Sequence, residues 1–391
     1  MMMFKSKVLA VALAIGLTTG AAQAADPIKI GLILPLSGGF STLGKQILDG
    51  VNLYMDTHGD TIGDRKVELF IRDDTGIAPD VSKRAAQELL VREKVDVLAG
   101  FGFTPAAFAV APLSASTKTP MVVMNAATSS ITEKSPYIVR TASTMGQFTA
   151  PMAMWAANNG LENVYTLVAD YGPGHDSEKQ FVKTLTEEGG TIVDTVRMPV
   201  QNPDFSPFLQ RVKDEKPDAV FLFVPAGEQG VSFIKGYRER ALDKEGIQLI
   251  STGDITTEDQ LAAIGDRALG LITSFTYSEA HDSKVNKEFI ESYYKKFPDQ
   301  RPTFLTVGGY DGMHLIYEVL KQTDGDASGD VFIDAAKGMA WESPRGPISI
   351  DPETRDIVQN VYIRKVEEVD GRLQNVEFDV ISNFKDPGKE R

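Results

Sequence analysis

Residues 28–46 read IKIGLILPLSGGFSTLGKQ, an apolar run that passes through a glycine-containing turn into a segment with helical spacing. Residues 28–34 are almost entirely apolar, which is typical of a strand buried on both faces of a parallel sheet. From Leu43 onward, Ile47, Val51 and Tyr54 recur on one helical face. The stretch therefore predicts a strand, a tight turn and a helix, which is the opening unit of an α/β fold.

The turn in this stretch is close to the phosphate-binding loop of nucleotide hydrolases. Gly39 is followed after four residues by Gly44 and Lys45, but Gln46 stands where that loop needs Ser or Thr to hold magnesium. We therefore expect a turn that lines a cleft and no nucleotide site.

The alternation of strands and helices continues along the chain in two series. A first series of apolar runs ends near residue 125, and a second begins after about residue 143. Expected strands are 28–34, 66–73, 95–100, 120–125, 163–170, 190–198, 218–224, 247–252 and 269–275, with later strands at 346–350, 358–369 and 373–381. Expected helices are 43–55, 80–93, 175–188, 206–215, 228–240, 257–264, 285–297 and 305–322. This pattern predicts an α/β protein with two doubly wound parallel-sheet lobes.

The first 24 residues have the three parts of a secretory signal peptide. Lys5 and Lys7 precede the apolar stretch VLAVALAIGL (8–17), and AQA (22–24) gives a small-x-small cleavage pattern. Cleavage after Ala24 would release a chain without a lipid anchor, since the sequence has no cysteine. We expect an exported protein that is not embedded in the membrane.

Composition and missing motifs exclude several classes of function. The formal net charge of −14 argues against general binding to nucleic acids, which relies on basic surface. Gly-x-Ser-x-Gly and His-Glu-x-x-His are absent, the four histidines are scattered, and GFGFTP has Pro105 where a dinucleotide fingerprint has its last glycine. We expect no catalytic site, no cofactor and no metal, and an exported hydrolase remains the distant alternative.

Five stretches together resemble the type I periplasmic solute-binding proteins of ABC importers, in the branched-chain amino-acid (Leu/Ile/Val-binding) group. They are IKIGLILPLSGGFSTLGKQILDGVNLYMD, AGFGFTPAAFAVAPLSASTKTPMVVMNAATSSIT, IVRTASTMGQ, DYGPG and ESPRGPISIDPETRDIVQNVYIRKV. The resemblance implies two lobes joined by three hinge crossings near 142, 275 and 347. The first lobe would hold 25–142 and 276–347, and the second 143–275 and 348–391.

The resemblance also implies a set of ligand-binding residues. Thr104 and Thr128 would offer hydroxyls to a ligand carboxylate, and Ala126 would add a backbone group. Tyr171 would close over the ligand, and Asp254 would bind the amino group of an amino acid. Such donors could hold a carboxylate without a counter-cation. The two threonines would equally suit helix caps, Tyr171 would suit plain packing, and Asp254 would suit a surface cap.

The chain departs from the family pattern at three positions. Leu43 stands where the family often has an aromatic residue, and Pro225 and Ala226 stand where amino-acid binders often place a tyrosine. These differences remove polar or aromatic contacts and change the size of the pocket, so they argue against a strict assignment of leucine, isoleucine or valine as the ligand. Phe40, Phe101, Phe103 and Tyr277 are the aromatic residues expected near the cleft, where they could line an apolar pocket, although core packing is the expected use of at least half of them.

The sequence thus predicts the periplasmic component of an ABC importer. It would capture a small carboxylate-bearing molecule, such as a branched-chain or other amino acid, and deliver it to a separate membrane permease. Aromatic or aliphatic organic acids are the alternative ligands, and the sensing subunit of a signalling receptor is the alternative role. A monomer is expected.

Overall fold

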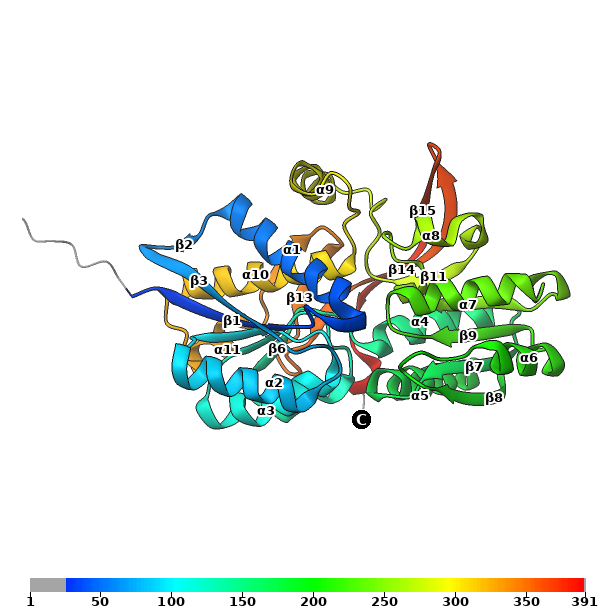
Figure 1. Ribbon diagram of the computed structural model, residues 1–391, viewed down its shortest axis with the longest axis horizontal. Coiled ribbons are helices and arrows are strands. Elements are labelled where there is room, and N and C mark those ends of the chain that lie inside the picture. The colour runs from blue at the N-terminus through cyan, green and yellow to red at the C-terminus, as the bar shows by residue number, and fades with distance from the viewer. Residues whose placement is uncertain (1–25, 390–391) are drawn as a thin grey trace, which may run out of the picture.

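The computed structural model describes residues 26–389, and the predicted signal peptide lies outside these residues. Two α/β lobes stand side by side, each built on its own sheet (Figure 1). The two-lobed α/β class expected from the sequence is therefore confirmed. Among the described residues, no helix is both long and apolar enough to cross a membrane.

The first lobe is built on a six-stranded sheet of order β2-β3-β1-β4-β5-β6. All of its neighbouring strands are parallel except the β2–β3 pair. Its strands are β1 Ile28–Leu34, β2 Thr61–Ile62, β3 Arg65–Asp73, β4 Val97–Gly100, β5 Met121–Val123 and β6 Ile138–Arg140. Because β1 lies at the centre, the opening stretch of the sequence forms the core of this lobe, with Ile30 paired to both Leu69 and Val97.

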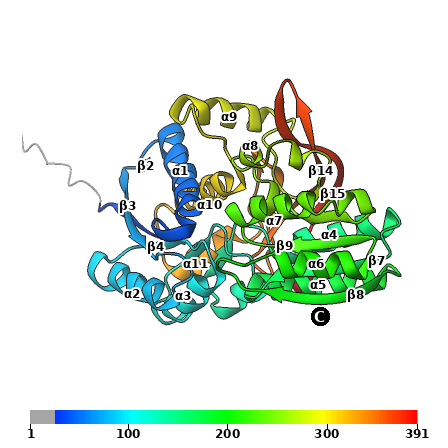
Figure 2. The ribbon, with the colours of Figure 1, turned by 45° about the vertical axis from the view of Figure 1, so that its right-hand side comes forward.

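Helices cover both faces of the first sheet. One face packs on α1 (Ser41–His58), α10 (Phe304–Gln322) and α11 (Gly329–Ala336). The other packs on α2 (Pro79–Glu88), which continues in a π-turn at Leu89–Glu93, and α3 (Thr104–Thr117). Helix α9 (Lys284–Lys296) lies beside α1, as Figure 2 shows.

The second lobe is built on a nine-stranded sheet of order β12-β13-β14-β11-β10-β9-β7-β8, with β15 paired to β14. The parallel strands are β7 Asn163–Ala169, β8 Thr191–Met198, β9 Ala219–Phe223, β10 Gln248–Thr252 and β11 Ile272–Phe275. The antiparallel strands are β12 Ala340–Ser343, β13 Gly346–Ile350, β14 Ile357–Val369 and β15 Arg372–Phe384. The turn between β14 and β15 is the predicted hairpin at 370–372.

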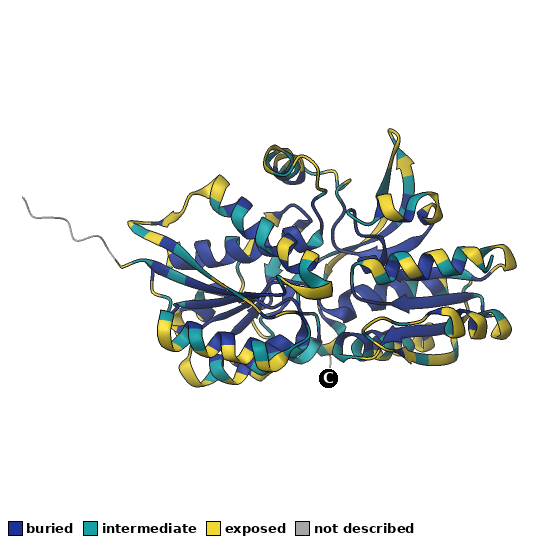
Figure 3. Cartoon of the chain, viewed as in Figure 1, coloured by how far each residue is buried: buried dark blue, intermediate teal, exposed yellow. Residues whose placement is uncertain are grey.

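Helices again cover both faces of the second sheet. Helices α4 (Met145–Asn158) and α5 (Gly172–Glu187) pack on one face. Helices α6 (Ser206–Glu215), α7 (Glu228–Glu239) and α8 (Leu261–Ile264) pack on the other. The central strands of both sheets are buried while the outer sides of the helices are exposed (Figure 3), which explains why these strands read as apolar runs.

Some expected boundaries and elements differ from the structure. The helix expected at 257–264 is only the single turn of α8, preceded by a 3₁₀ turn at Gly253–Thr256. Helices α3, α4 and α11 were not predicted. Helices α3 and α4 each contain an internal proline and bury residues on several sides, so they lack the amphipathic stripe that marks a surface helix.

Chain segments that join the lobes lie against one another between the two sheets. The Ser143 hydroxyl lies 3.2 Å from the Thr276 hydroxyl and accepts from Gln359 Nε2 at 2.8 Å. The predicted boundary at 347 falls inside β13, which pairs with the second sheet although Ile350 packs in the core of the first lobe. The exact lobe boundaries stay a prediction.

Candidate functional site

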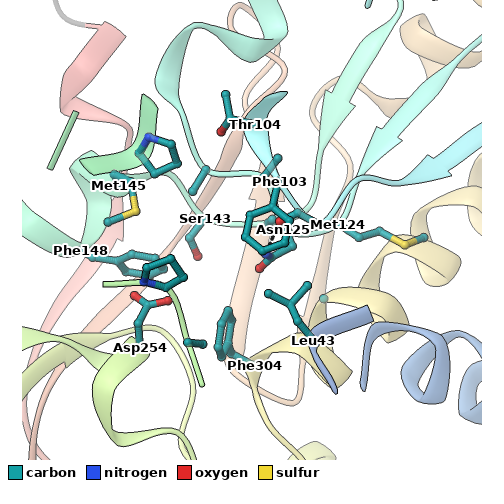
Figure 4. Close-up of a pocket in the computed structure, with 18 of the residues that line it drawn as sticks. Leu43, Phe103, Thr104, Met124, Asn125, Ser143, Met145, Phe148, Asp254 and Phe304 are labelled. Carbon is teal, nitrogen blue, oxygen red and sulfur yellow. Dashed lines mark hydrogen bonds between the residues drawn. The ribbon is translucent and has the colours of Figure 1, made fainter. Parts of the chain in front are cut away.

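A cavity lies between the lobes and is lined by residues from both. It holds about 620 Å³ of space free of protein atoms, part of it open to solvent. Figure 4 shows Thr104 and Asp254 on different sides of it, with Leu43, Phe103 and Phe304 along one flank and Met145 and Phe148 along another. The lining residues are Leu43, Gly102, Phe103, Thr104, Met124, Asn125, Ala126, Ala127, Ala142, Ser143, Met145, Phe148, Tyr171, Pro173, Phe223, Pro225, Ala226, Asp254, Phe304, Gly308 and Arg345.

Two helix N-termini without side-chain caps meet this cavity from opposite lobes. Helix α3 begins at Thr104 after Phe103, and α5 begins at Gly172 after Tyr171; neither preceding side chain makes a capping hydrogen bond. Free N–H groups and the positive end of the helix dipole favour an anion at such a place. The cap alternative for Thr104 is thereby excluded, because it lies inside the helix.

The hydroxyls of Thr104 and Thr128 form a buried pair at the same end of the cavity. Thr104 Oγ1 donates to Thr128 Oγ1 at 3.1 Å, so the Thr128 hydroxyl keeps its own proton for another acceptor. Thr128 lies outside the cavity lining itself and makes no side-chain cap on the 3₁₀ turn Ser129–Lys134. A Cβ on Gly172 would come within 3.0 Å of Thr128 Oγ1, which shows how closely α5 approaches this pair.

Arg140 fixes the loop between β5 and the 3₁₀ turn Ser129–Lys134 by hydrogen bonds to the backbone carbonyls of the loop. This fully buried guanidinium donates to the carbonyls of Ala126 at 3.2 Å and Thr128 at 2.8 Å, and pairs with Asp356 at 2.6 Å. Ala126 lines the cavity, but its N–H donates to Phe101 O at 3.0 Å. The backbone group expected from Ala126 is therefore already used.

Aromatic side chains form the walls of the cavity. Tyr171 lies nearly parallel to Phe223, with ring centroids 6.2 Å apart. Phe148 and Phe304 both contact Phe275, at 4.4 and 4.7 Å between centroids. A planar apolar ligand would find contact on both sides here.

Asp254 is a buried carboxylate in the wall contributed by the second lobe. Its side chain accepts from Thr252 Oγ1 at 2.7 Å, and the residue is 9 % exposed. Burial raises its pKa to about 6, which the Thr252 hydrogen bond and the Arg364 charge only partly offset. The surface-cap alternative is excluded by this burial, and an ionised Asp254 would gain from a ligand group that donates a hydrogen bond.

Of the four predicted aromatic residues only Phe103 lines the cavity, and Phe40 packs edge-on against Phe103 from outside the lining, with ring centroids 4.8 Å apart. The other two lie in the core. Tyr277 is fully buried among Leu53, Phe289, Tyr293 and Val307, and Phe101 is buried in the core between the first sheet and α3. Tyr277 follows the second connection between the lobes, and the chain there turns its side chain toward α1 and α9. It therefore supports the connection between the lobes and not the cavity.

Several lining residues were not predicted from the sequence. Asn125, Ser143 and Arg345 lie within the stretches that carry the family resemblance but were not singled out, and Phe148 and Phe304 lie outside those stretches; all five line the cavity. The arginine is the most consequential, because a cavity without a cation was expected. Among the described residues, no group of three or more His, Asp or Glu side chains is placed to hold a metal ion.

The two lobes also touch directly outside the cavity lining. Gln46 Nε2 donates to Asp259 at 3.0 Å, and the Ser129 N–H donates to Asp176 on α5 at 2.9 Å. Gln46, the residue that broke the phosphate-loop pattern, is thus an inter-lobe contact. Gly44 lies inside α1, where a Cβ would clash with the Pro35 carbonyl at 2.1 Å, so this glycine serves close packing.

Comparison with known proteins gives consistent matches over nearly the whole chain. A family model described as Periplasmic binding protein matches residues 27–372. A Leu/Ile/Val-binding protein homolog 6 from Brucella melitensis biotype 1 is 45% identical over 384 residues, covering 98% of each chain.

Two solved structures are also similar. One is the solute-binding protein of an ABC transporter from Rhodopseudomonas palustris BisB5 in complex with 3,4-dihydroxybenzoic acid, with 55% identity and a TM-score of 0.90 over 93% of this chain and 99% of that one. The other is an ABC-transporter solute-binding protein from R. palustris in complex with 4-hydroxybenzoate, with 45% identity, a TM-score of 0.90 and the same coverage.

Proposed function

The chain belongs to the periplasmic binding protein family, and on that premise we propose that its ligand is a ring-hydroxylated aromatic carboxylate. Family membership confirms the resemblance stated from the sequence and makes the protein a solute-binding component of an ABC transporter. The family consists of substrate-binding proteins, and we propose that this chain catalyses no reaction.

The observation that carries the proposal is the separation of two polar ends by an aromatic middle. Two uncapped helix N-termini and the Thr104–Thr128 pair suit a carboxylate, while Asp254 suits a hydrogen-bond donor. Phe103, Phe148 and Phe304 flank the space between Thr104 and Asp254 (Figure 4), and Tyr171 and Phe223 line the same cavity. A hydroxybenzoate has this order of groups: carboxylate, ring and hydroxyl.

The geometry favours an aromatic acid over an amino acid. In an α-amino acid the ammonium sits on the carbon next to the carboxylate, whereas Thr104 and Asp254 lie on different sides of the cavity (Figure 4). Structures at 55% and 45% identity hold 3,4-dihydroxybenzoic acid and 4-hydroxybenzoate. Pro225 and Ala226 also stand where amino-acid binders often have a tyrosine.

An amino-acid ligand remains the second candidate. Asp254 would pair with an ammonium group, and the similar Brucella protein is named as a Leu/Ile/Val-binding protein homolog. Isothermal titration of ligand-stripped protein distinguishes the two candidates. We expect binding of 4-hydroxybenzoate and 3,4-dihydroxybenzoate and little binding of leucine; tight binding of leucine without binding of hydroxybenzoates would overturn the proposal.

The remaining expectations complete the proposed role. We propose export through cleavage after Ala24, a monomeric state, and delivery of the ligand to a separate membrane permease. N-terminal sequencing of the periplasmic protein tests the cleavage site. Loss of hydroxybenzoate uptake in a deletion strain supports import, whereas intact uptake with a lost transcriptional response would favour the sensing role.

A further inference from the structure

Arg345 brings a positive charge to a cavity in which none was expected. The residue lies between β12 and β13, is 4 % exposed, and lines the cavity. Its Nη2 donates to the Thr141 carbonyl at 2.5 Å and pairs with Asp311 at 2.8 Å. The guanidinium is therefore anchored where the segments connecting the two lobes meet.

The donors of Arg345 are only partly used. Its Nε is buried without a hydrogen-bond partner among the described residues. A buried donor on a charged group that lacks a partner is costly, so such atoms usually face a ligand or water. Since this side chain lines the cavity, a bound ligand is the candidate acceptor for the free Nε–H.

Asp311 already neutralises the charge of the Arg345 guanidinium, so a negatively charged ligand group is not required there. The 1 % exposed Asp311 balances the guanidinium charge and also accepts from Ser343 Oγ at 2.8 Å and Trp341 Nε1 at 3.2 Å. A neutral oxygen on the ligand would accept from the free Arg345 Nε without adding a further buried charge.

We propose that Arg345 is a specificity-determining residue that donates a hydrogen bond to a hydroxyl oxygen on the ring of the ligand. This inference rests on the proposed function and adds a second polar contact on the ring beside that with Asp254. The two contacts are complementary, because Asp254 accepts a hydroxyl proton while Arg345 donates to a hydroxyl oxygen. A dihydroxylated ring can use both, and benzoate can use neither.

The test compares four ligands on three proteins by isothermal titration. The ligands are benzoate, 3-hydroxybenzoate, 4-hydroxybenzoate and 3,4-dihydroxybenzoate, and the proteins are the wild type, Arg345→Lys and Arg355→Lys. The lysine at position 345 keeps a positive charge beside Asp311 but loses the guanidinium fork. Arg355, which donates to the carbonyls of Ser135 and Thr132 outside the cavity, provides the matched control.

We expect Arg345→Lys to lower the affinity for 3,4-dihydroxybenzoate and for at least one monohydroxybenzoate by about 10- to 100-fold. This is the effect of losing one hydrogen bond to a charged group. Benzoate should change less than about threefold, and Arg355→Lys should leave all four affinities near the wild-type values. An equal loss for benzoate would show that Arg345 holds the carboxylate, and unchanged affinities would remove it from the site. Either result overturns the inference.

A second variant covers the case in which Arg345→Lys does not fold. Arg345→Met combined with Asp311→Asn removes both charges, so that no lone charge stays buried. The same selective loss for ring-hydroxylated acids is expected, and a uniform loss overturns the inference. If the wild type binds none of the four acids, the proposed function itself fails, which is a separate result.

Discussion

Replacing Asp254 by asparagine should stabilise the ligand-free protein and weaken the binding of 4-hydroxybenzoate. Burial raises the pKa of Asp254 from 3.8 to about 6. Between these values the folded protein binds more protons than the unfolded chain, so stability falls as the pH rises through this window. Above pH 6 the ionised carboxylate therefore destabilises the ligand-free fold.

The magnitude follows from the size of the pKa shift. A shift of about two pKa units corresponds to roughly 3 kcal/mol, and Asp254→Asn should recover up to that amount at pH 7.5. For a folded chain of this size the unfolding entropy is about 0.8 kcal/mol/K, so the melting temperature should rise by about 4 °C. The gain should vanish near pH 4, where Asp254 is largely protonated in the folded wild type.

The same substitution that raises the melting temperature of the ligand-free protein should lower its affinity for a ring-hydroxylated ligand. Asp254→Asn loses a charged acceptor for the ring hydroxyl, so the Kd of 4-hydroxybenzoate should rise by roughly 10-fold or more. Benzoate has no hydroxyl to lose and should bind about as well as before.

Thermal melts of ligand-stripped protein at pH 4, 6 and 7.5, with titrations of both acids at pH 7.5, provide the measurement. Asp370→Asn, at the exposed tip of the β14–β15 hairpin, is the matched control and should show neither effect. If Asp254→Asn melts like the wild type at every pH, burial does not destabilise the ionised carboxylate. If benzoate and 4-hydroxybenzoate lose affinity equally, Asp254 does not face the ring hydroxyl.

Three further substitutions test the carboxylate end of the cavity. Thr128→Val should weaken every carboxylate ligand by about 1–3 kcal/mol with little change in the melting temperature, and unchanged titrations would remove this hydroxyl from the site. Gly172→Ala should weaken binding by about 1 kcal/mol, because its Cβ would crowd Thr128 Oγ1 at 3.0 Å; an unaltered Kd would show that α5 can shift without cost. Arg140→Met should lower the free energy of unfolding in urea by about 3 kcal/mol, because the buried Asp356 loses its 2.6 Å ion pair and keeps only Lys389 at 3.5 Å and the Thr132 hydroxyl at 3.1 Å. A loss below about 1 kcal/mol would mean that Lys389 and Thr132 suffice for Asp356 or that it takes up a proton.

Local pattern predicted the framework of this protein well. The run at 28–34 forms β1 with the expected bounds, and the hairpin at 370–372 joins two long strands. Both depend on neighbours in sequence, since apolar runs and turn residues act over a few positions. Helices α3 and α4 were missed, because a helix buried on most sides carries no polar face to mark its period.

The candidate site could be predicted only in part. The resemblance led to Thr104, Tyr171 and Asp254, which line the cavity together, and to Thr128, which contacts Thr104 from behind the lining. It also led to Tyr277, whose side chain lies in another cluster. The direction of one side chain at a chain crossing depends on packing, which a linear pattern does not encode.

The sequence by itself determined the two α/β lobes, the family and the positions of the loops that end at the cavity. Only the tertiary structure decided how those loops meet: it joined Arg345 to Thr141 across 204 positions and buried Asp254 until its pKa rose to about 6. Strands and helices arise from short-range periodicity, whereas burial and charge pairing depend on residues far apart in the chain. The chemistry of the cavity depends on such distant residues, because each lobe supplies part of its lining.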